Sequence, residues 1–181
     1  MNATVRSIAA LVLLLPGIAG AQWIEFEELV WGFTINFPHT PRSEPLDYTT
    51  YYGATVPAQR FDTSGADGEY SVTVVYFSGA PTDSHTAIAY ATQAVADRGD
   101  VTYNAFDNLD GIPGQMISVT EPDGRRTQAS IYFVDQRLYI AQGSVPANGP
   151  SPSRFAQSIV IIGPDGEQIV LDEDPPNVGD D

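Results

Sequence analysis

The sequence predicts an α+β fold, a largely antiparallel sheet with helices packed on it. About eight segments of the 181-residue chain alternate apolar and polar residues, as half-buried strands do. Short turns rich in glycine, proline and aspartate join most of these segments, which is typical of antiparallel pairing. Two further segments, which begin near Thr82 and at Ser151, carry helix-start signals.

The first strands are short alternating runs. Residues 23–28 predict a strand with one mostly polar edge, and residues 33–37 predict a second strand with three apolar residues on one face. The runs 46–52 and 55–61 lie on either side of Gly53. We therefore expect these two runs to form a hairpin that turns near this glycine.

The strongest strand signal lies at residues 70–77, after a turn rich in glycine and aspartate at 65–68. Both faces of this strand are apolar, so we expect a central strand that is covered on both sides. A helix is expected next, from an N-cap at Thr82 or Asp83 to Arg98. Its apolar stripe at helical spacing consists of Ala87, Ile88, Ala91, Ala94 and Val95.

The second half of the chain predicts a meander of antiparallel strands. Strands are expected at residues 101–106, 116–120, 128–134 and 138–142, and the first of them is followed by a turn at 108–114. The later turns contain Pro-Asp-Gly and Asp-Gln, which are residues that favour tight turns.

A second helix is expected after this meander. Ser151 is the expected N-cap and Pro152 the first helical residue, which are the positions these residue types prefer. Phe155 and Ile159, four residues apart, would then make the core contacts of the helix. A short strand is expected at residues 168–171.

The amino terminus predicts export. Residues 1–21 combine Arg6, an apolar run from Ile8 to Leu15 and the small-residue pattern Ala19-Gly20-Ala21. This combination is typical of a cleaved secretory signal peptide. We therefore expect a mature protein that begins at Gln22 and is soluble in the periplasm or outside the cell.

The remaining chain predicts one domain and a tail. Residues 172–181 hold five acidic residues, two prolines and no base, which predicts a disordered acidic tail. Residues 22–171 are then a single α+β domain. The chain has no cysteine, so disulfides, thiolate metal sites and cysteine nucleophiles are excluded, and the core must stabilise the fold.

The charge of the chain restricts its partners. The chain has 23 acidic residues against eight basic ones, all of them arginine, and its net charge is -15. A surface of this charge repels phosphate backbones and anionic lipid. We therefore expect neither nucleic acid nor an anionic membrane surface as a partner.

Residue types used in catalysis are present but form no catalytic pattern. His39 lies in a loop between prolines and His85 opens the first helix, without an HExxH motif. Asp83-Ser84-His85 contains the residue types of a triad, but neighbours in sequence cannot adopt triad geometry, and helix capping is expected instead. We predict no catalytic, cofactor-binding or metal-binding residue, and no cofactor.

Two groups of carboxylates were the remaining candidates for chemistry. Residues 107–111 are similar to a calcium loop, but the third position holds leucine and the twelfth holds serine, so a turn is expected. Glu25, Glu27 and Glu69 lie in predicted strands and could be buried. A carboxylate-based hydrolase would need two of them to face each other across a cleft.

Aromatic and basic side chains provide candidate contact points. Tyr48, Tyr51 and Tyr52 lie at the tip of the expected hairpin, and with Trp31 they could contact a partner protein. Arg125 and Arg126 form one positive point on a negative protein, in a turn that we expect to be exposed to water.

Residues 32–38, GFTINFP, resemble the opening motif of the PsbP-like family. RLYI at 137–140 and RFAQSI at 154–159 resemble its closing strand and its last helix, and the order of elements over residues 23–162 is also similar. The resemblance implies an α/β/α sandwich, in which an antiparallel sheet lies between helices.

The resemblance also implies binding and assembly more than catalysis. The family includes an extrinsic subunit of the photosynthetic oxygen-evolving complex, a Ran-binding nuclear import factor and small exported bacterial proteins of unknown role. No functional residue is carried over from these members, because the matching positions are apolar and are expected in the core. Fold by itself does not determine function.

The function we expect is that of an exported, non-catalytic interaction or assembly protein of the cell envelope, with another envelope protein as its partner. One alternative is a small-ligand or cation-binding module, which needs a concave pocket with converging polar groups. The other alternative is the carboxylate-based hydrolase. The sequence leaves the oligomeric state and the identity of the partner open.

Overall fold

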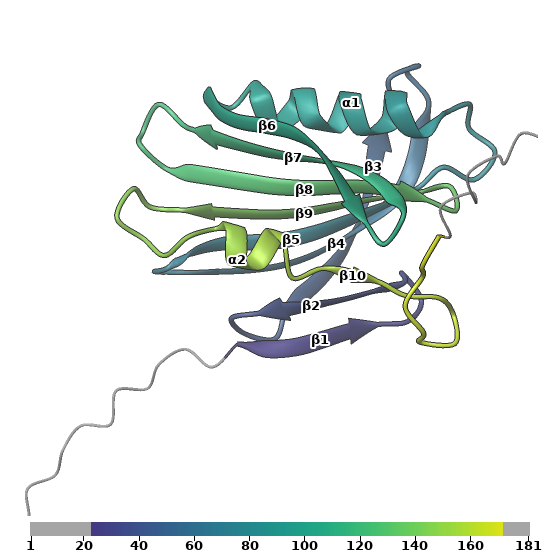
Figure 1. Cartoon of the computed structure of the whole chain (residues 1–181), viewed down its shortest axis with the longest axis horizontal. Coiled ribbons are helices and arrows are strands. Elements are labelled where there is room, and N and C mark those ends of the chain that lie inside the picture. Colours follow the sequence, from purple (N-terminus) through teal and green to yellow (C-terminus); the bar gives the residue numbers. More distant parts are fainter. Residues whose placement is uncertain (1–22, 172–181) are drawn as a thin grey trace, which may run out of the picture.

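A computed structural model describes residues 23–171 (Figure 1), so the predicted signal peptide at 1–21 and the predicted acidic tail at 172–181 lie outside the described residues. The described chain contains ten strands and two helices. In chain order these are β1 (Ile24–Glu28), β2 (Phe33–Phe37), β3 (Arg42–Thr49), β4 (Thr55–Gly65), β5 (Gly68–Tyr76), α1 (Ser84–Ala96), β6 (Asp100–Leu109), β7 (Ile112–Thr120), β8 (Arg126–Val134), β9 (Arg137–Val145), α2 (Ser153–Ala156) and β10 (Val160–Ile161). Neither helix of this part combines the length and apolar character that a membrane span requires.

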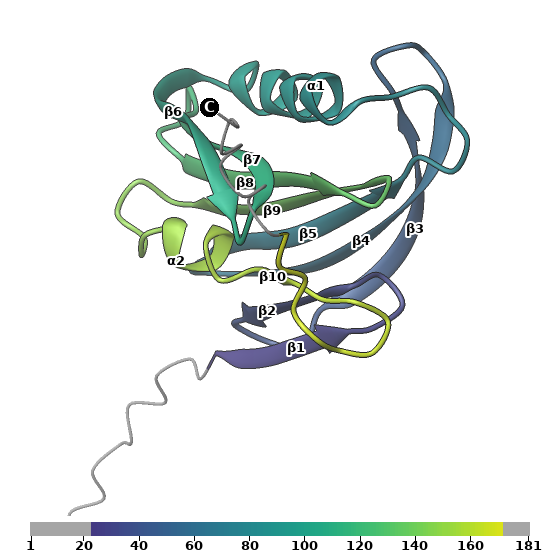
Figure 2. The ribbon, with the colours of Figure 1, turned by 45° about the vertical axis from the view of Figure 1, so that its right-hand side comes forward.

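Seven strands form the main sheet, in the order β3-β4-β5-β9-β8-β7-β6, and every neighbouring pair is antiparallel. A second sheet of three strands, β1-β2-β10, lies against the main sheet. Figure 2 shows α1 above the main sheet and the small sheet below it. The α+β class with a largely antiparallel sheet is therefore confirmed.

Each face of the main sheet has its own hydrophobic core. On one face, the buried side of α1 packs against residues such as Val75, Ile117, Ile131 and Leu138. On the other face, apolar residues of β2 and α2 meet a different set of sheet residues, among them Val72 and Tyr139. β5 contributes to both cores, so the expectation of a central strand covered on both sides is confirmed.

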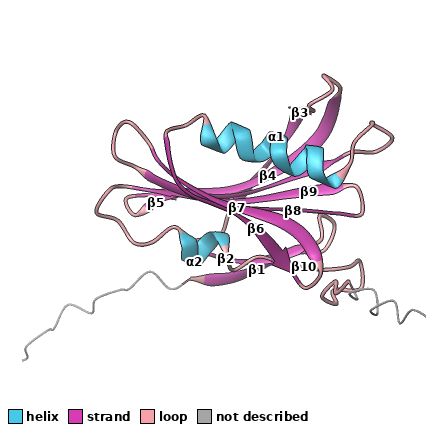
Figure 3. Cartoon of the chain, turned by 45° about the horizontal axis from the view of Figure 1, so that its top comes forward, coloured by secondary structure: helices cyan, strands magenta, loops and turns pink. Residues whose placement is uncertain are grey.

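The second outer layer differs from the simplest form of the α/β/α sandwich. A helix, α1, covers one face of the main sheet, whereas the other face is covered mainly by the small sheet and by the four residues of α2 (Figure 3). Phe33, Ile35 and Phe37 of β2 are at most 1% exposed, so the small sheet supplies most of the apolar cover that a longer helix would provide.

The first helix begins and ends near its predicted bounds. Asp83 is the N-cap, and α1 continues to Ala96. The apolar stripe differs at one position, because Ala94 is exposed and Thr92 is buried. Burial of this threonine is tolerated because its hydroxyl donates a hydrogen bond to the Ile88 carbonyl at 2.8 Å.

Two predictions near the carboxyl end were wrong, one about the length of a helix and one about the presence of a strand. The second helix begins at Ser153 and ends at Ala156, so Ile159 lies beyond it, although Phe155 and Ile159 are both buried as expected. Residues 168–171 form no strand, and Gln168 makes only an isolated bridge to Ile162. The two-residue strand β10 pairs with β2 instead, at the side of β2 that β1 leaves open.

The turn expected at residues 108–114 is shorter in the structure. Asp110 and Gly111 have positive φ angles of 53° and 87°, and the Asn108 side chain accepts a hydrogen bond from the Gly111 amide at 2.8 Å. This two-residue turn is tight enough for β7 to begin at Ile112, so Pro113 and Gly114 belong to the strand.

Candidate functional site

A groove lined by tyrosines is the most prominent candidate site. Tyr51 and Tyr52, in the turn between β3 and β4, are 64% and 57% exposed, and Tyr90 of α1 is 36% exposed. The groove has a volume of about 510 Å³. Its lining consists of Tyr51, Tyr52, His85, Thr86, Ala89, Tyr90 and Gln93, which we call the tyrosine groove.

The local sequence explains why two tyrosines stand at the hairpin tip. Gly53 has a φ of 78°, a conformation that favours glycine, and its amide donates to the Thr50 carbonyl at 2.9 Å. The buried Thr50 closes the loop by exchanging hydrogen bonds with Ala54. The turn therefore satisfies its own backbone groups and leaves the rings of Tyr51 and Tyr52 on the surface.

Aromatic contacts connect the groove to the core beneath α1. The ring of Tyr51 meets those of Tyr52 and Tyr90 edge to face, at centroid distances of 5.2 and 6.0 Å. The ring of Tyr48 lies 6.3 Å from Tyr90 and 6.4 Å from the buried Phe77. Edge-to-face pairs of this kind stabilise aromatic clusters. The exposed tyrosines are thus supported by packed rings, which reduces their freedom before any partner binds.

Half-burial changes the chemistry of Tyr48. Burial, together with the neighbouring Tyr90, raises the pKa of Tyr48 to about 12. The phenol of an ordinary tyrosine is already protonated at physiological pH, so the raised pKa matters only in alkaline solution, and the Tyr48 ring acts as a support for the groove.

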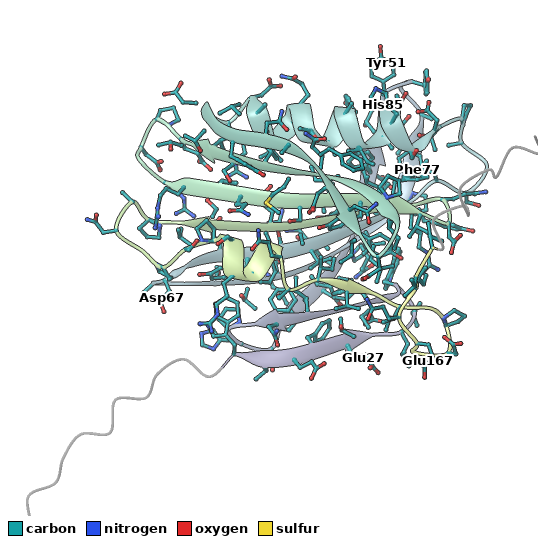
Figure 4. The ribbon with its side chains drawn as sticks, viewed as in Figure 1. Glu27, Tyr51, Asp67, Phe77, His85 and Glu167 are labelled. Atoms are coloured by element: carbon teal, nitrogen blue, oxygen red, sulfur yellow. The ribbon has the colours of Figure 1, made fainter. Side chains whose placement is uncertain are left out.

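The two histidines lie in different places. His85 is exposed on the first turn of α1 and lines the tyrosine groove, and Figure 4 shows it beside Tyr51 and above Phe77. His39 lies in the loop before β3, next to Arg42 and Asp62. The described chain therefore does not bring the two imidazoles into one site.

Asp83 acts as a helix cap, as the sequence predicts. Its carboxylate accepts hydrogen bonds from the amide and the hydroxyl of Thr86, both at 2.8 Å. These two hydrogen bonds lower the pKa of Asp83. Because its carboxylate is occupied by Thr86, Asp83 does not orient His85 in the manner of a triad.

The other aromatic and basic candidates lie elsewhere. Trp31 packs against the core beneath the small sheet, so it does not join the hairpin tyrosines. The turn expected to be exposed to water is exposed at Pro122 and Asp123, whereas Arg125 and Arg126 are half-buried and form hydrogen bonds. Arg125 donates hydrogen bonds to the carbonyl and hydroxyl of Ser144, and Arg126 donates to the carbonyl of Gly149 at 2.6 Å. Arg125 thus connects the start of β8 to β9, and Arg126 connects it to the loop that follows β9.

The candidate carboxylates do not form a catalytic pair. Glu25 and Glu27 are exposed on β1, and Glu69 is exposed on β5, where it lies 3.6 Å from the Arg125 guanidinium. Figure 4 shows Glu27 at the opposite end of the molecule from Tyr51. Asp107 accepts a hydrogen bond from Tyr132 at 2.6 Å. Within residues 23–171, no three His, Asp or Glu side chains gather to hold a metal ion.

The five groove residues that come from α1, Tyr90 and His85 among them, could not be assigned to the hairpin from the sequence. The signal available for Tyr90 was an aromatic residue outside the apolar stripe of a helix, which marks an exposed ring. Which neighbour that ring would meet depends on the position of α1 over the sheet. That position is a property of the fold and not of the local pattern.

The chain has similar proteins among solved structures. No protein-family model matches the chain, and no curated protein matches it in sequence. Among solved structures, the chain is similar to the solution structure of cyanobacterial PsbP (CyanoP) from Synechocystis sp. PCC 6803, with 16% sequence identity and a TM-score of 0.49. The match covers 81% of this chain and 96% of that one.

Proposed function

We propose that this chain is an exported, non-catalytic interaction or assembly protein of the cell envelope, and that it contacts another envelope protein through the tyrosine groove. The observation that carries the proposal is the gathering of Tyr51, Tyr52 and Tyr90 around one open groove. Tyrosine is enriched at protein interfaces because its ring buries apolar area while its hydroxyl bonds to polar groups.

Two polar side chains that line the groove already have hydrogen-bond partners within the protein, which favours a protein partner over a small ligand. A small-ligand pocket needs several polar groups that converge on the ligand. Here the Gln93 amide already donates to Asp97 at 2.6 Å, and the Thr86 hydroxyl donates to Asp83. The groove therefore offers mainly aromatic surface, which suits the apolar centre of a protein interface.

The charge of the protein supports the choice of partner. With a net charge of -15, this chain associates fastest with a basic surface, because opposite charges steer the encounter. The sequence pattern at 1–21 supports export, so the expected partner is an envelope protein with a basic patch around an apolar contact.

Site-specific photocrosslinking in the source organism tests the proposal. p-Benzoylphenylalanine in place of Tyr52 is expected to capture one envelope protein. The same probe in place of Glu27, an exposed position on the opposite sheet, serves as the control. The crosslink is expected to disappear when Tyr51 and Tyr90 are changed to alanine. Equal capture from both positions, or capture that survives the alanine changes, would contradict the use of the groove.

Export is tested separately on the untagged protein. The intact mass of the mature chain is expected to begin at Gln22, and the protein is expected in the periplasmic or extracellular fraction. A native mass that includes residues 1–21 would contradict cleavage.

A further inference from the structure

The two edges of the main sheet differ in their protection against another strand. β3 and β6 form the opposite edges, as Figure 2 shows. β3 carries three charged residues and a proline, namely Arg42, Glu44, Asp47 and Pro45. Charged side chains and proline are the usual means by which an edge strand rejects a further strand. The run from Val101 to Phe106 in β6 contains no charge, no proline and no glycine.

The side chains of this run are unusually exposed for apolar residues. Val101, Tyr103 and Phe106 are 48%, 51% and 70% exposed. Valine, tyrosine and phenylalanine also favour extended backbone. Within residues 23–171, β6 pairs with β7 alone, so the outer backbone groups of β6 remain available.

Most of β6 keeps a regular register. The bulge lies between Val101 and Tyr103, where the Thr102 hydroxyl donates to the Ser118 carbonyl at 3.2 Å. From Tyr103 to Leu109 every residue has its partner on β7. A continuous stretch of this length is sufficient for strand addition, since natural strands average five to six residues.

Side-chain hydrogen bonds hold this edge in place before any partner arrives. Gln115 of β7 donates to Asn104, and Tyr132 of β8 donates to Asp107 across β7. These contacts restrain β6 near its middle and near its end. A preformed edge loses little conformational freedom when another strand pairs with it.

The charges at the two ends of the run indicate the chemistry of the added strand. Asp100 and Asp107 flank the run, and within residues 23–171 neither carboxylate forms an ion pair. The Asp107 carboxylate accepts hydrogen bonds from the Tyr132 hydroxyl and the Asn108 amide, but both donors are neutral, so its negative charge is not balanced. Opposite charges directly across a strand pair are stabilising, and like charges are destabilising. An added strand with an apolar centre and a basic residue at each end would complement this edge.

Two other occupants fit the edge less well. A second copy of this chain would bring another net charge of -15 to the contact. The chain's own carboxyl end is close, because the Leu171 amide donates to the Asp110 carbonyl beside β6. The sequence that follows, however, holds five acidic residues and two prolines. The acidic residues would repel Asp100 and Asp107, and the prolines have no amide proton to donate to a ladder of hydrogen bonds.

We propose that β6 is a docking edge for an extended segment of a partner protein, a segment with an apolar centre and basic ends that adds as an eighth strand. Main-chain hydrogen bonds supply the affinity in such strand addition, and the side chains supply the specificity. The site contains no residue of the tyrosine groove, so it is an interaction surface beyond the proposed function.

A synthetic peptide tests this edge on the chain 22–181. The probe is the capped peptide Arg-Val-Thr-Val-Thr-Val-Arg, and amide hydrogen exchange is followed by NMR. Binding is expected to slow exchange at amides of β6 by at least about tenfold, and to leave the amides of β3 unchanged. No slowing at β6 up to about 1 mM peptide, or equal slowing at β3, would overturn the proposal.

Two altered peptides separate backbone pairing from simple charge attraction. Methylation of alternate backbone nitrogens removes the donors of one peptide edge but keeps every side chain, and it is expected to weaken binding at least about tenfold. Replacement of both arginines by glutamate is expected to have a similar effect, because of Asp100 and Asp107. Binding that survives N-methylation would show that the peptide does not add as a strand and would overturn the proposal.

Matched protein variants locate the contact and distinguish the other occupants. Phe106→Lys is expected to weaken peptide binding at least about tenfold, while Val30→Lys adds the same charge at a 74% exposed position away from β6 and is expected to have no effect. Tyr51→Ala is also expected to leave peptide binding unchanged, which separates this site from the tyrosine groove. If deletion of 172–181 greatly increases the affinity for the peptide, the tail occupies the edge and the proposal is overturned. If the protection of β6 amides rises with protein concentration in the absence of peptide, a second copy occupies the edge, which also overturns the proposal.

Discussion

The hydroxyl of Tyr132 donates a 2.6 Å hydrogen bond to the carboxylate of Asp107. The two residues belong to β8 and β6, so this bond crosses the intervening strand β7. The ring of Tyr132 passes over Gly114, the β7 residue with which it pairs. Burial, the hydrogen bond to Asp107 and the charge of Asp107 raise the pKa of Tyr132. This arrangement fastens the exposed edge strand to the interior of the sheet.

Gly114→Ala is expected to destabilise the protein, because a Cβ at this position would clash with the Tyr132 ring and the Ile131 carbonyl. Overpacking of this kind costs about 1–3 kcal/mol, measured as the free energy of unfolding in urea. Gly65→Ala is the matched control, since a Cβ there meets open space, and its effect is expected within about 0.5 kcal/mol. Equal effects of the two changes would contradict the close packing.

Tyr132→Phe is expected to release β6 from the sheet. The change keeps the ring but removes the hydroxyl that donates a hydrogen bond to Asp107. A hydrogen bond to a charged group contributes about 1.5–3 kcal/mol to stability. Amide hydrogen exchange in β6 is expected to become faster than in wild type, whereas exchange in β4 stays the same. Tyr103→Phe, at an exposed hydroxyl of the same strand, is the control. If β6 exchanges no faster in Tyr132→Phe than in the control, the bond does not restrain the edge.

Alkaline pH is expected to weaken the fold through its buried tyrosines. The pKa of Tyr48 rises from an ordinary value of 10.0 to about 12 on folding, so between these values the unfolded chain loses a proton that the folded chain keeps. Its contribution to stability is fully present below pH 10 and decreases as the pH approaches 12. The pKa values of Tyr70, Tyr132 and Tyr139 are also raised, mainly by burial, and act in the same direction.

Tyr48→Phe is therefore expected to make the decrease of the unfolding free energy with pH less steep, without abolishing it. Denaturant unfolding at several pH values between 9 and 12 measures this slope. Each unit of difference between the folded and unfolded pKa contributes about 1.4 kcal/mol to the free energy of unfolding. Tyr51→Phe removes a hydroxyl from a 64% exposed ring and serves as the control. A slope that is identical in wild type and Tyr48→Phe would contradict the burial of this phenol.

Phe155→Ala is expected to cost about 3–5 kcal/mol of stability, as truncations of buried aromatic rings do. Phe155 is 0% exposed, and its ring packs against Trp23, Phe37 and Tyr70 at centroid distances of 5.0–6.3 Å. Phe106→Ala removes the same ring from a 70% exposed position and is expected to change stability by less than about 1 kcal/mol. A cost below about 1 kcal/mol for Phe155→Ala would show that α2 does not pack on the small sheet.

Local chemistry explains why the turns and the first helix could be predicted. Asp135 and Gln136 adopt positive φ angles of 49° and 61° in a two-residue hairpin turn, and the sequence predicts a turn at this dipeptide. Asp83 caps α1 through a hydrogen bond to an amide three residues away. Interactions of this kind depend on neighbours in sequence, so the pattern of residue types contains them.

The candidate site could be predicted only in part. Tyr51 and Tyr52 were expected at a hairpin tip, and they are there. Tyr90 joins them only because α1 lies over the face of the sheet from which the hairpin extends, and Trp31 is absent from the groove because the small sheet packs on the opposite face. The sequence shows that each of these residues is aromatic, but it does not show which distant ring each of them contacts.

The sequence by itself determined the first helix, most of the extended segments and the apolar face of most of them, because these properties follow from the period of the hydrophobic pattern and from turn residues. Only the tertiary structure decided that β5 pairs with β9, that β10 completes the small sheet, and that β6 is left as an edge. The physical reason is that apolar burial is non-directional: many partners would bury the same face, and the choice among them depends on how all the elements pack at once.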